Sequence, residues 1–305
     1  MTSNRSLYTR LLGVALLGAL ATSGCGEDTD SKSSANTIVD VAKGAGSFTT
    51  LVGALEKTGL DKTLRGAGPF TVFAPTDAAF ALLPPSVLAS LDNETLSTIL
   101  TYHVYAGKAM ASTVVTLPSA NTVQGEPVSI LVSGGSVFLN GMAKVTTTDI
   151  AADNGVIHVI DAVLLPPSIP FPGTIVDALK ASPTFSTLVS AVVTAELATT
   201  LAGDNSGQGF TVFAPMNGAF DKLGIELSTV DKATLTNVLL YHVAGSKVPA
   251  SQVVKLSSAP TLEGASVSIA VAGGKVKLDG EATVVRTDLN TTNGIIHIID
   301  TVLMP

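Results

Sequence analysis

The hexapeptide Phe70-Thr71-Val72-Phe73-Ala74-Pro75 occurs twice in this chain, because it returns unchanged as Phe210-Thr211-Val212-Phe213-Ala214-Pro215. Three further blocks recur in the same order, at offsets of 137 to 139 residues. A period this long indicates two tandem globular domains, because the units of a solenoid run about 20–50 residues. The recurring blocks are Thr37–Asp40 with Thr174–Asp177, Tyr102–Val104 with Tyr241–Val243, and Asn154–Asp161 with Asn293–Asp300.

Length and composition agree with two domains that each bury a core. The chain has 305 residues, 13% of them charged, and a formal net charge of −7. This length allows two domains of about 100–200 residues. An acidic chain without a basic stripe argues against nucleic-acid binding. The predicted organisation is a signal peptide at 1–24, a lipidated cysteine and polar tether at 25–36, a first domain at 37–167, a proline-rich linker at 168–173 and a second domain at 174–305.

The N-terminus has the pattern of an export signal. Arg5 and Arg10 precede an apolar run, 11–21, and a small-residue exit. The next residue is Cys25, the only cysteine. Two interpretations stay open: an ordinary cleavage site with an incidental thiol, or a lipoprotein signal whose cysteine is acylated, although Thr22 stands where that signal prefers leucine. We favour the second, since the chain has no second cysteine with which Cys25 could form a disulfide. Acyl chains would anchor the protein to a membrane surface.

Each repeat begins with helical periodicity. In the first, apolar residues recur at helical spacing over 48–55. A short apolar strand follows over 71–74, and we expect it to stop before Pro75, which cannot donate to a ladder. A second helix is expected beyond the Pro84-Pro85 pair, with Asp92 or Asn93 as its cap. The second repeat reproduces these patterns.

The second half of each repeat is strand-like. The runs 128–132 and 136–139 flank Gly134-Gly135, a two-residue hairpin signature that recurs at Gly273-Gly274. A final strand over 156–165 is apolar on both faces, as a central buried strand would be. The fold class is therefore α+β, with helices first and then a mainly antiparallel sheet or sandwich.

The order of these motifs resembles that of the fasciclin-like domain family. The motifs are Phe-Thr-Val-Phe-Ala-Pro followed by Ala-Phe, then Tyr-His, then Asn-Gly-(Val/Ile)-Ile-His-(Val/Ile)-Ile-Asp, over about 36–167 and 173–305. The resemblance implies, in each repeat, a fasciclin-like β-sandwich wedge packed with several helices. It also implies a role in adhesion or matrix interaction and not in catalysis. Met216 stands where the family usually has Thr or Ser, so the second copy is expected to present that turn differently.

The four histidines form two repeat-related pairs, His103 with His242 and His158 with His297. One interpretation is a metal or catalytic pair in each domain. We favour buried imidazoles bonded to backbone, since the first pair continues an apolar helix face and the second lies in apolar strands. Asp161 follows His158 by three residues, which places it on the opposite face of a strand. No catalytic thiol, nucleophile elbow, zinc-protease motif or phosphate loop occurs, so we predict no enzyme, no metal site and no cofactor.

The candidate binding residues surround the loop before the last strand of each repeat. In the fasciclin-like family, an acidic residue followed by Ile or Leu at this place, with the nearby Tyr-His, resembles a cell-adhesion motif. The alternative, which we favour, is that the acidic residues make turn bonds to backbone and the apolar residues pack under the loop. The matching positions are Asp149, Ile150, Tyr102 and His103 in the first copy and Asp288, Leu289, Tyr241 and His242 in the second.

Three functional hypotheses follow. The first is a monomeric adhesion or matrix-interaction protein of the bacterial cell envelope, at the outer membrane or surface. Its partner would be a surface protein or polysaccharide, and only its N-terminal lipid would touch the membrane. The second is a periplasmic binding module for a small apolar ligand or polysaccharide, favoured by a pocket that one copy alone has kept. The third is an envelope hydrolase, which needs convergent titratable groups from different segments.

Overall fold

The computed structural model describes residues 36–305 except 86, 88–90 and 225–226. The predicted signal peptide, Cys25 and all but the last residue of the tether lie outside the described residues. Residues Asn36–Pro305 form one compact unit. Within this described part, every helix is too short or too polar to cross a membrane.

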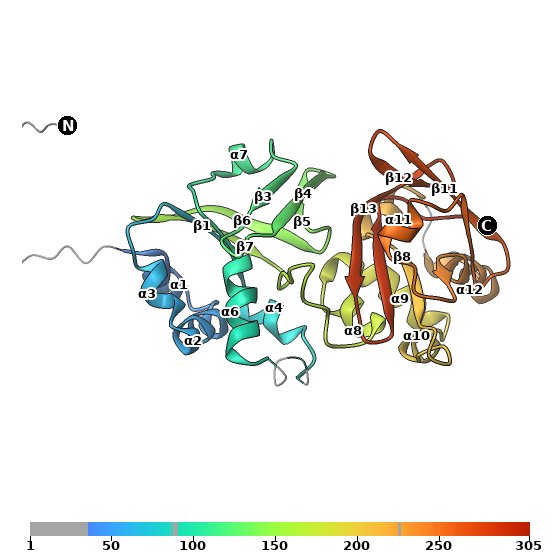
Figure 1. Cartoon of the computed structure of the whole chain (residues 1–305), viewed down its shortest axis with the longest axis horizontal. Helices are drawn as coiled ribbons and strands as arrows, with labels where there is room; N and C mark the ends of the chain where they lie inside the picture. The colour runs from blue at the N-terminus through green and yellow to red at the C-terminus, as the bar shows by residue number, and fades with distance from the viewer. Residues whose placement is uncertain (1–35, 86, 88–90, 225–226) are drawn as a thin grey trace, which may run out of the picture. The chain divides into compact units, whose positions relative to one another are not determined.

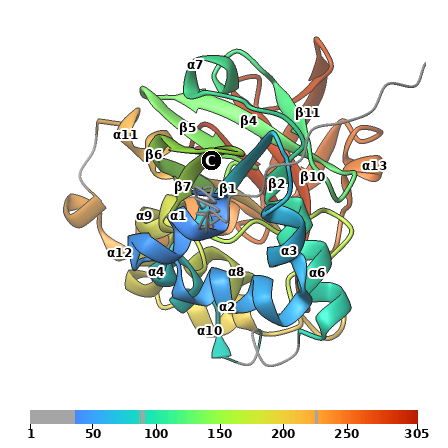
Figure 2. The same ribbon diagram turned by 90° about the vertical axis from the view of Figure 1, so that its left-hand side faces the viewer.

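The first repeat packs helices against a seven-stranded sheet (Figure 1). The strand order is β2-β1-β7-β6-β5-β4-β3, with β1 and β7 parallel and every other neighbour antiparallel. Figure 2 shows α2 and α6 on the opposite side of the sheet from α7. The helices are α1 (Ile38–Ala45), α2 (Thr49–Thr58), α3 (Leu60–Leu64), α4 (Asp77–Ala81), α6 (Asn93–Tyr102) and α7 (Ala111–Val114); the strands are β1 (Phe70–Pro75), β2 (Val104–Tyr105), β3 (Ser119–Asn121), β4 (Pro127–Ser133), β5 (Ser136–Leu139), β6 (Ala143–Ala152) and β7 (Gly155–Ile160).

The second repeat builds the same sheet, in the order β10-β11-β12-β13-β14-β8-β9. The predicted α+β domain in each repeat is therefore confirmed. Its helices are α8 (Ile175–Lys180), α9 (Ser186–Thr194), α10 (Ala198–Ala202), α11 (Asn217–Asp221), α12 (Lys232–Tyr241) and α13 (Ala250–Val253), with short 3-10 turns at Pro183–Phe185 and Leu227–Thr229; the strands are β8 (Phe210–Pro215), β9 (Val243–Ala244), β10 (Ser258–Pro260), β11 (Ser266–Ala272), β12 (Lys275–Leu278), β13 (Ala282–Asn290) and β14 (Gly294–Ile299).

The repeated hexapeptide is the strand that joins the helices to the sheet. β1 runs parallel to β7 in a register from Phe70 opposite Gly155 to Pro75 opposite Ile160. The strand includes Pro75, one residue beyond the predicted end. The N–H of Phe73 points towards the side of β2 and bonds the carbonyl of His103, the residue before β2, at 2.9 Å. Position 75 faces the same side beyond the end of β2, so its missing N–H breaks no ladder.

The Asn-Gly pair before β7 fastens this strand to the helices. The Asn154 side chain accepts from the N–H of Ile38 at 2.9 Å and donates to Leu64 O and Gly66 O at 2.7 and 2.8 Å. It is buried, so each of its polar atoms needs such a partner. Asn293 makes the matching bonds in the second repeat, to Ile175 N, Leu201 O and Gly203 O.

The local predictions for helices and turns are mostly confirmed. α2 covers the predicted periodic segment except its first residue, Phe48, which is the N-cap. Asp92 caps α6 by accepting from Thr95 N at 2.7 Å. The β4–β5 hairpin turns at Gly134 and Gly135 with φ of 56° and 72°, which glycine adopts without strain. The second repeat has the same turn.

Two strand predictions in the second half of the repeat were wrong. β7 ends at Ile160, the last residue paired with β1 and β6, and beyond it the N–H of Asp161 makes one more bond to Lys144 O of β6 at 3.2 Å. The apolar residues 162–165 are buried without strand pairing, and Leu164 N bonds to a histidine ring instead. The segment expected to be a loop before the last strand is part of β6, which carries a register shift between Thr147 and Ile150. The run of polar residues in the middle of β6 interrupts the alternation of apolar and polar residues that would have indicated a strand.

The proline-rich linker packs against the second repeat, where the N–H of Phe171 bonds Asn290 O at 2.7 Å. It turns at Pro166–Ile169 through a 3.0 Å backbone bond, and Phe171 is buried. Contacts between the repeats include two bonds to the carbonyl of Met142, which accepts from the hydroxyls of Ser182 and Thr184 at 2.5 and 2.7 Å. The linker therefore contributes one buried apolar side chain, that of Phe171, which the proline content of the linker did not indicate.

Candidate functional site

Asp149 lies at the bulge of β6, with its backbone in the left-handed region at φ 60°. Its carboxylate accepts from the N–H of Ala111 at 2.8 Å, so it caps the start of α7. Its own N–H donates to Nδ1 of His158 at 3.3 Å, and Nε2 of that ring bonds Ala109 O at 2.8 Å. Because Nδ1 accepts the N–H of Asp149, the ring donates to Ala109 O through Nε2.

The second repeat reproduces this arrangement, which we call the aspartate latch. Asp288 has φ 57°, and its carboxylate accepts from Ala250 N at 2.8 Å. Its N–H donates to Nδ1 of His297 at 3.2 Å, and Nε2 of that ring bonds Val248 O at 2.9 Å. Burial lowers the pKa of His297. Each latch therefore ties the bulge of one strand to the short helix beside it.

The Tyr-His pairs are core residues that hold other segments in place. Tyr102 donates to Pro127 O and accepts from Nδ2 of Asn140, both at 2.9 Å, and burial raises its pKa. His103 bonds Ile99 O through Nδ1 at 2.7 Å and accepts from Leu164 N at Nε2 at 3.0 Å. The favoured interpretation of this histidine, a buried ring bonded to backbone, is confirmed.

In the second repeat, Tyr241 donates to Oδ2 of Asp279 at 3.0 Å. His242 bonds Val238 O at 2.7 Å and accepts from Leu303 N at 2.9 Å. Of the eight candidate positions, five are at most 6% exposed, and they are Tyr102, His103, Tyr241, His242 and Leu289. The three half-buried ones are Asp149, Ile150 and Asp288.

A patch of five valines, none of them among the predicted binding residues, lies beside each latch. In the first repeat, Val114, Val115, Val137 and Val145 line one small gap between α7 and the sheet. Val132 is the cross-strand partner of Val137, so their side chains share a face. The equivalent residues, all exactly 139 positions on and all valine, are Val253, Val254, Val271, Val276 and Val284.

The outer part of this valine patch is exposed in both repeats. Val115 and Val132 are 44% and 50% exposed, and Val254 and Val271 are 47% and 55% exposed. The remaining valines are half-buried or buried and continue into the core beneath the sheet. The sequence contained the signal, five valines at one constant offset, but could not show that they share a surface.

The histidines of the described residues are engaged in bonds within the fold. The ring nitrogens of the four histidines all bond to backbone atoms. No group of three or more His, Cys, Asp or Glu side chains in the described part could hold a metal ion. An apolar gap next to α6, lined by residues such as Phe80, Leu96 and Leu100, has a volume of only about 30 Å³. Ligand sites occupy about 300–1,000 Å³, so this gap is packing space.

Comparison with known proteins identifies both repeats. The Fasciclin domain model matches residues 46–166 and 183–305. The chain is 32% identical over 267 residues to transforming growth factor-beta-induced protein ig-h3 of Sus scrofa, a match that spans 85% of this chain and 38% of that protein. It is 47% identical over 138 residues to protein sll1483 of Synechocystis sp., spanning 44% of this chain and 76% of that protein.

Among solved structures, a FAS1 domain pair from the insect cell adhesion molecule Fasciclin I has a TM-score of 0.47 and 21% identity, over 86% of this chain and 98% of that one. The chain spans well under two thirds of the pig relative. The two matches of the family model together take in most of the chain, so it belongs to the fasciclin-domain family, with one such domain in each repeat.

Proposed function

We propose that this chain is a non-catalytic adhesion protein whose two fasciclin domains each hold a protein partner through the valine patch. The observation that carries the proposal is the identity of all five valines in both repeats, including the two that are about half exposed. An exposed apolar side chain alone needs no explanation, but apolar patches on a soluble surface mark interaction sites. Membership of the fasciclin family supports the same class of function.

Two of the candidate binding residues, Asp149 and Asp288, support the valine patch in this proposal without forming its surface. The bonds from Asp149 to Ala111 and from Asp288 to Ala250 hold α7 and α13 at the edge of each patch. A surface that is ordered before binding loses less conformational entropy when the partner arrives. Two such surfaces on one chain raise the overall affinity through effective concentration, even where each contact is weak.

Replacing the exposed valines is expected to abolish most binding without unfolding the protein. The variant Val115→Ser/Val132→Ser/Val254→Ser/Val271→Ser should retain cells or separated envelope fractions at least tenfold less when immobilised. Each side chain is about half exposed, so little buried area is lost. The matched control is Val123→Ser/Val193→Ser, which changes valines of 47% and 55% exposure outside the patch.

Retention that is equal in the patch variant and the control would contradict the valine patch as the contact surface. The variant Asp149→Ala/Asp288→Ala tests the latches separately and is expected to weaken retention. Changing one repeat alone should weaken retention by less than changing both, because the intact domain still binds. A complete absence of retention by the unaltered protein would remove the adhesion proposal itself.

We further propose that Cys25 is acylated and anchors the protein in the cell envelope. Support comes from the sequence pattern of residues 1–25, where a positive segment and an apolar run precede the only cysteine. Cys25→Ala is expected to move the protein from the membrane fraction to a soluble or retained-precursor pool, since acyl chains contribute about 0.8 kcal/mol per buried methylene. Fractionation with detergent checks this, and unchanged partitioning into the membrane fraction would contradict the proposed lipid anchor.

A further inference from the structure

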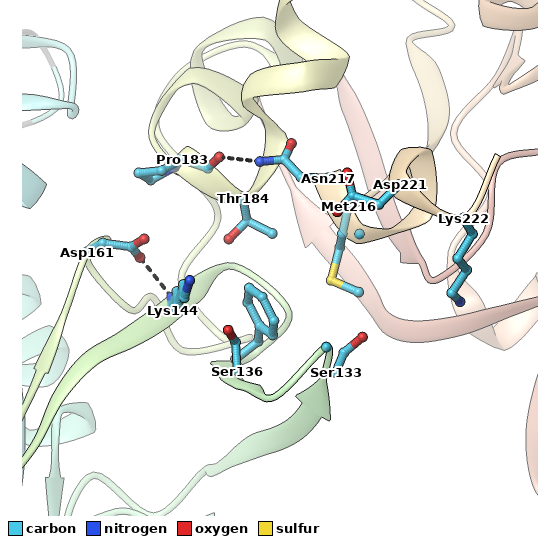
Figure 3. Close-up of a pocket in the computed structure, with 13 residues that line it drawn as sticks. Ser133, Ser136, Lys144, Asp161, Pro183, Thr184, Met216, Asn217, Asp221 and Lys222 are labelled. Carbon is cyan, nitrogen blue, oxygen red and sulfur yellow. Dashed lines mark hydrogen bonds between the residues drawn. The ribbon is translucent and has the colours of Figure 1, made fainter. Parts of the chain in front are cut away.

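A cleft of about 660 Å³ lies where the β4–β5 hairpin of the first repeat approaches α11 of the second. Its volume falls within the range of small-molecule sites, about 300–1,000 Å³. Figure 3 shows Ser133, Ser136, Lys144 and Asp161 on one wall and Met216, Asn217 and Lys222 on the other. The aspartate latches and the valine patches do not depend on this cleft.

The wall from the first repeat offers an aromatic ring beside unpaired polar atoms. Phe138 is half-buried and lines the cleft. Asp161 accepts from the backbone N–H of Lys144 at 2.7 Å through Oδ1, which fixes its carboxylate. Burial raises the pKa of this carboxyl. Its second oxygen and the Lys144 ammonium bond to no other residue of the described chain, so both remain available to a ligand.

The wall from the second repeat adds one more charge of each sign. Asp221 and Lys222 are exposed at the rim, and Lys222 donates to Asp300 O at 2.7 Å. Asn217 lines the cleft too, but its amide is already occupied: it accepts from Thr187 N and donates to Pro183 O, both at 3.0 Å. The cleft is therefore lined by two carboxylates and two ammonium groups, with no net charge.

This lining selects among classes of ligand. An anion meets two carboxylates, a cation meets two ammonium groups, and a purely apolar molecule must displace water from all four charges without compensation. A sugar satisfies the lining, because each hydroxyl both donates and accepts, and the C–H face of the ring packs on an aromatic side chain. We propose that this cleft binds a neutral oligosaccharide, with Phe138 under a sugar ring and Asp161 and Lys144 bonded to its hydroxyls.

The duplicated sequence shows that the cleft belongs to the pair of repeats and not to the single domain. The positions equivalent to Phe138 and Lys144 in the second repeat are Lys277 and Thr283. Met216, which lines the cleft and is buried, replaces a threonine that caps α4 in the first repeat. Loss of such a cap costs about 1 kcal/mol. The two copies thus diverge at cleft positions while keeping their motifs and valine patches.

Calorimetric titration of the full-length chain in a detergent without a sugar headgroup tests the proposal. The probes are cellohexaose, chitohexaose, maltohexaose and laminarihexaose, with anionic hexagalacturonate for comparison. We expect one neutral oligosaccharide to bind with one site per chain. Phe138→Leu, which keeps an apolar side chain but removes the flat ring, and Asp161→Asn should each weaken it at least tenfold.

Asp300→Asn is the matched control. The Asp300 carboxylate holds the N–H of Thr283 at 2.7 Å just as Asp161 holds that of Lys144, but Asp300 does not line the cleft. Lys222 bonds the backbone carbonyl of Asp300, which the substitution keeps, so this variant should bind like the unaltered chain. Binding by none of the four neutral probes, tighter binding of hexagalacturonate, or equal weakening in Asp300→Asn would overturn the proposal. The serine variants of the valine patch should bind the oligosaccharide normally, which separates this site from the adhesion surface.

Discussion

Replacing Gly155 by alanine is expected to lower the free energy of unfolding by about 3 kcal/mol or more. A β-carbon at this position would lie 2.0 Å from Phe70 O and 2.7 Å from Cδ1 of Ile38. The carbonyl belongs to the backbone of β1, and the neighbouring N–H of that residue is held by Asn154 O at 3.0 Å. The backbone therefore cannot move aside without breaking the junction of β1 with β7.

The duplicated domain supplies a second test and a control. Gly294→Ala should have a similar effect, since its β-carbon would meet Phe210 O at 2.4 Å and Cδ1 of Ile175 at 2.5 Å. Gly53→Ala, in the middle of α2, has no atom within 4 Å of the new carbon and should raise stability by about 0.5–1 kcal/mol. Urea unfolding followed by far-ultraviolet circular dichroism measures all three. A Gly155→Ala protein as stable as the unaltered chain would contradict the expected clash.

The recurring Asn-Gly pair shows how much of the fold the sequence could predict. The motif marked the start of a buried strand, and β7 begins there. Its physical role was not predictable, because the Asn154 side chain bonds residues 88 to 116 positions away. Local patterns such as the Asp92 cap and the Gly134-Gly135 turn need only neighbouring residues, so they were predicted correctly.

The candidate site was harder to predict for the same reason. Asp149 bonds Ala111, 38 residues earlier, and no periodicity reports a contact of that kind. The valine patch joins α7 to β4, β5 and β6, which come together only when the sheet has formed. The cleft needs side chains from both repeats. Sequence patterns identified the repeated domain, whereas the surfaces available to partners depended on long-range packing.

Acidification from pH 6.5 to pH 4 is expected to destabilise the protein through His103 and His242. Burial lowers the pKa of each ring from the usual 6.5 to about 4. Each Nε2 accepts a backbone N–H, from Leu164 or Leu303, and loses that bond when it is protonated. Above pH 6.5 both rings are neutral in the folded and the unfolded chain, so their contribution to stability is complete.

Between pH 6.5 and pH 4 only the unfolded chain takes up these protons. The free energy of unfolding should therefore fall by about 1.4 kcal/mol per pH unit for each histidine, or about 3 kcal/mol each by pH 4. His297, whose pKa burial also lowers, acts in the same direction.

The matched variant is His103→Gln, which removes the titrating ring but keeps a polar side chain. At pH 7 it should be less stable than the unaltered protein, because the bonds to Ile99 and Leu164 are lost or distorted. Between pH 6.5 and pH 4 the free energy of unfolding of this variant should fall less steeply than that of the unaltered protein. The difference between the two slopes should be about 1.4 kcal/mol per pH unit, the contribution of one histidine. Urea unfolding at half-unit pH steps measures both slopes. Equal slopes would mean that His103 is protonated in the folded domain, which its acceptor bond to Leu164 N–H does not allow.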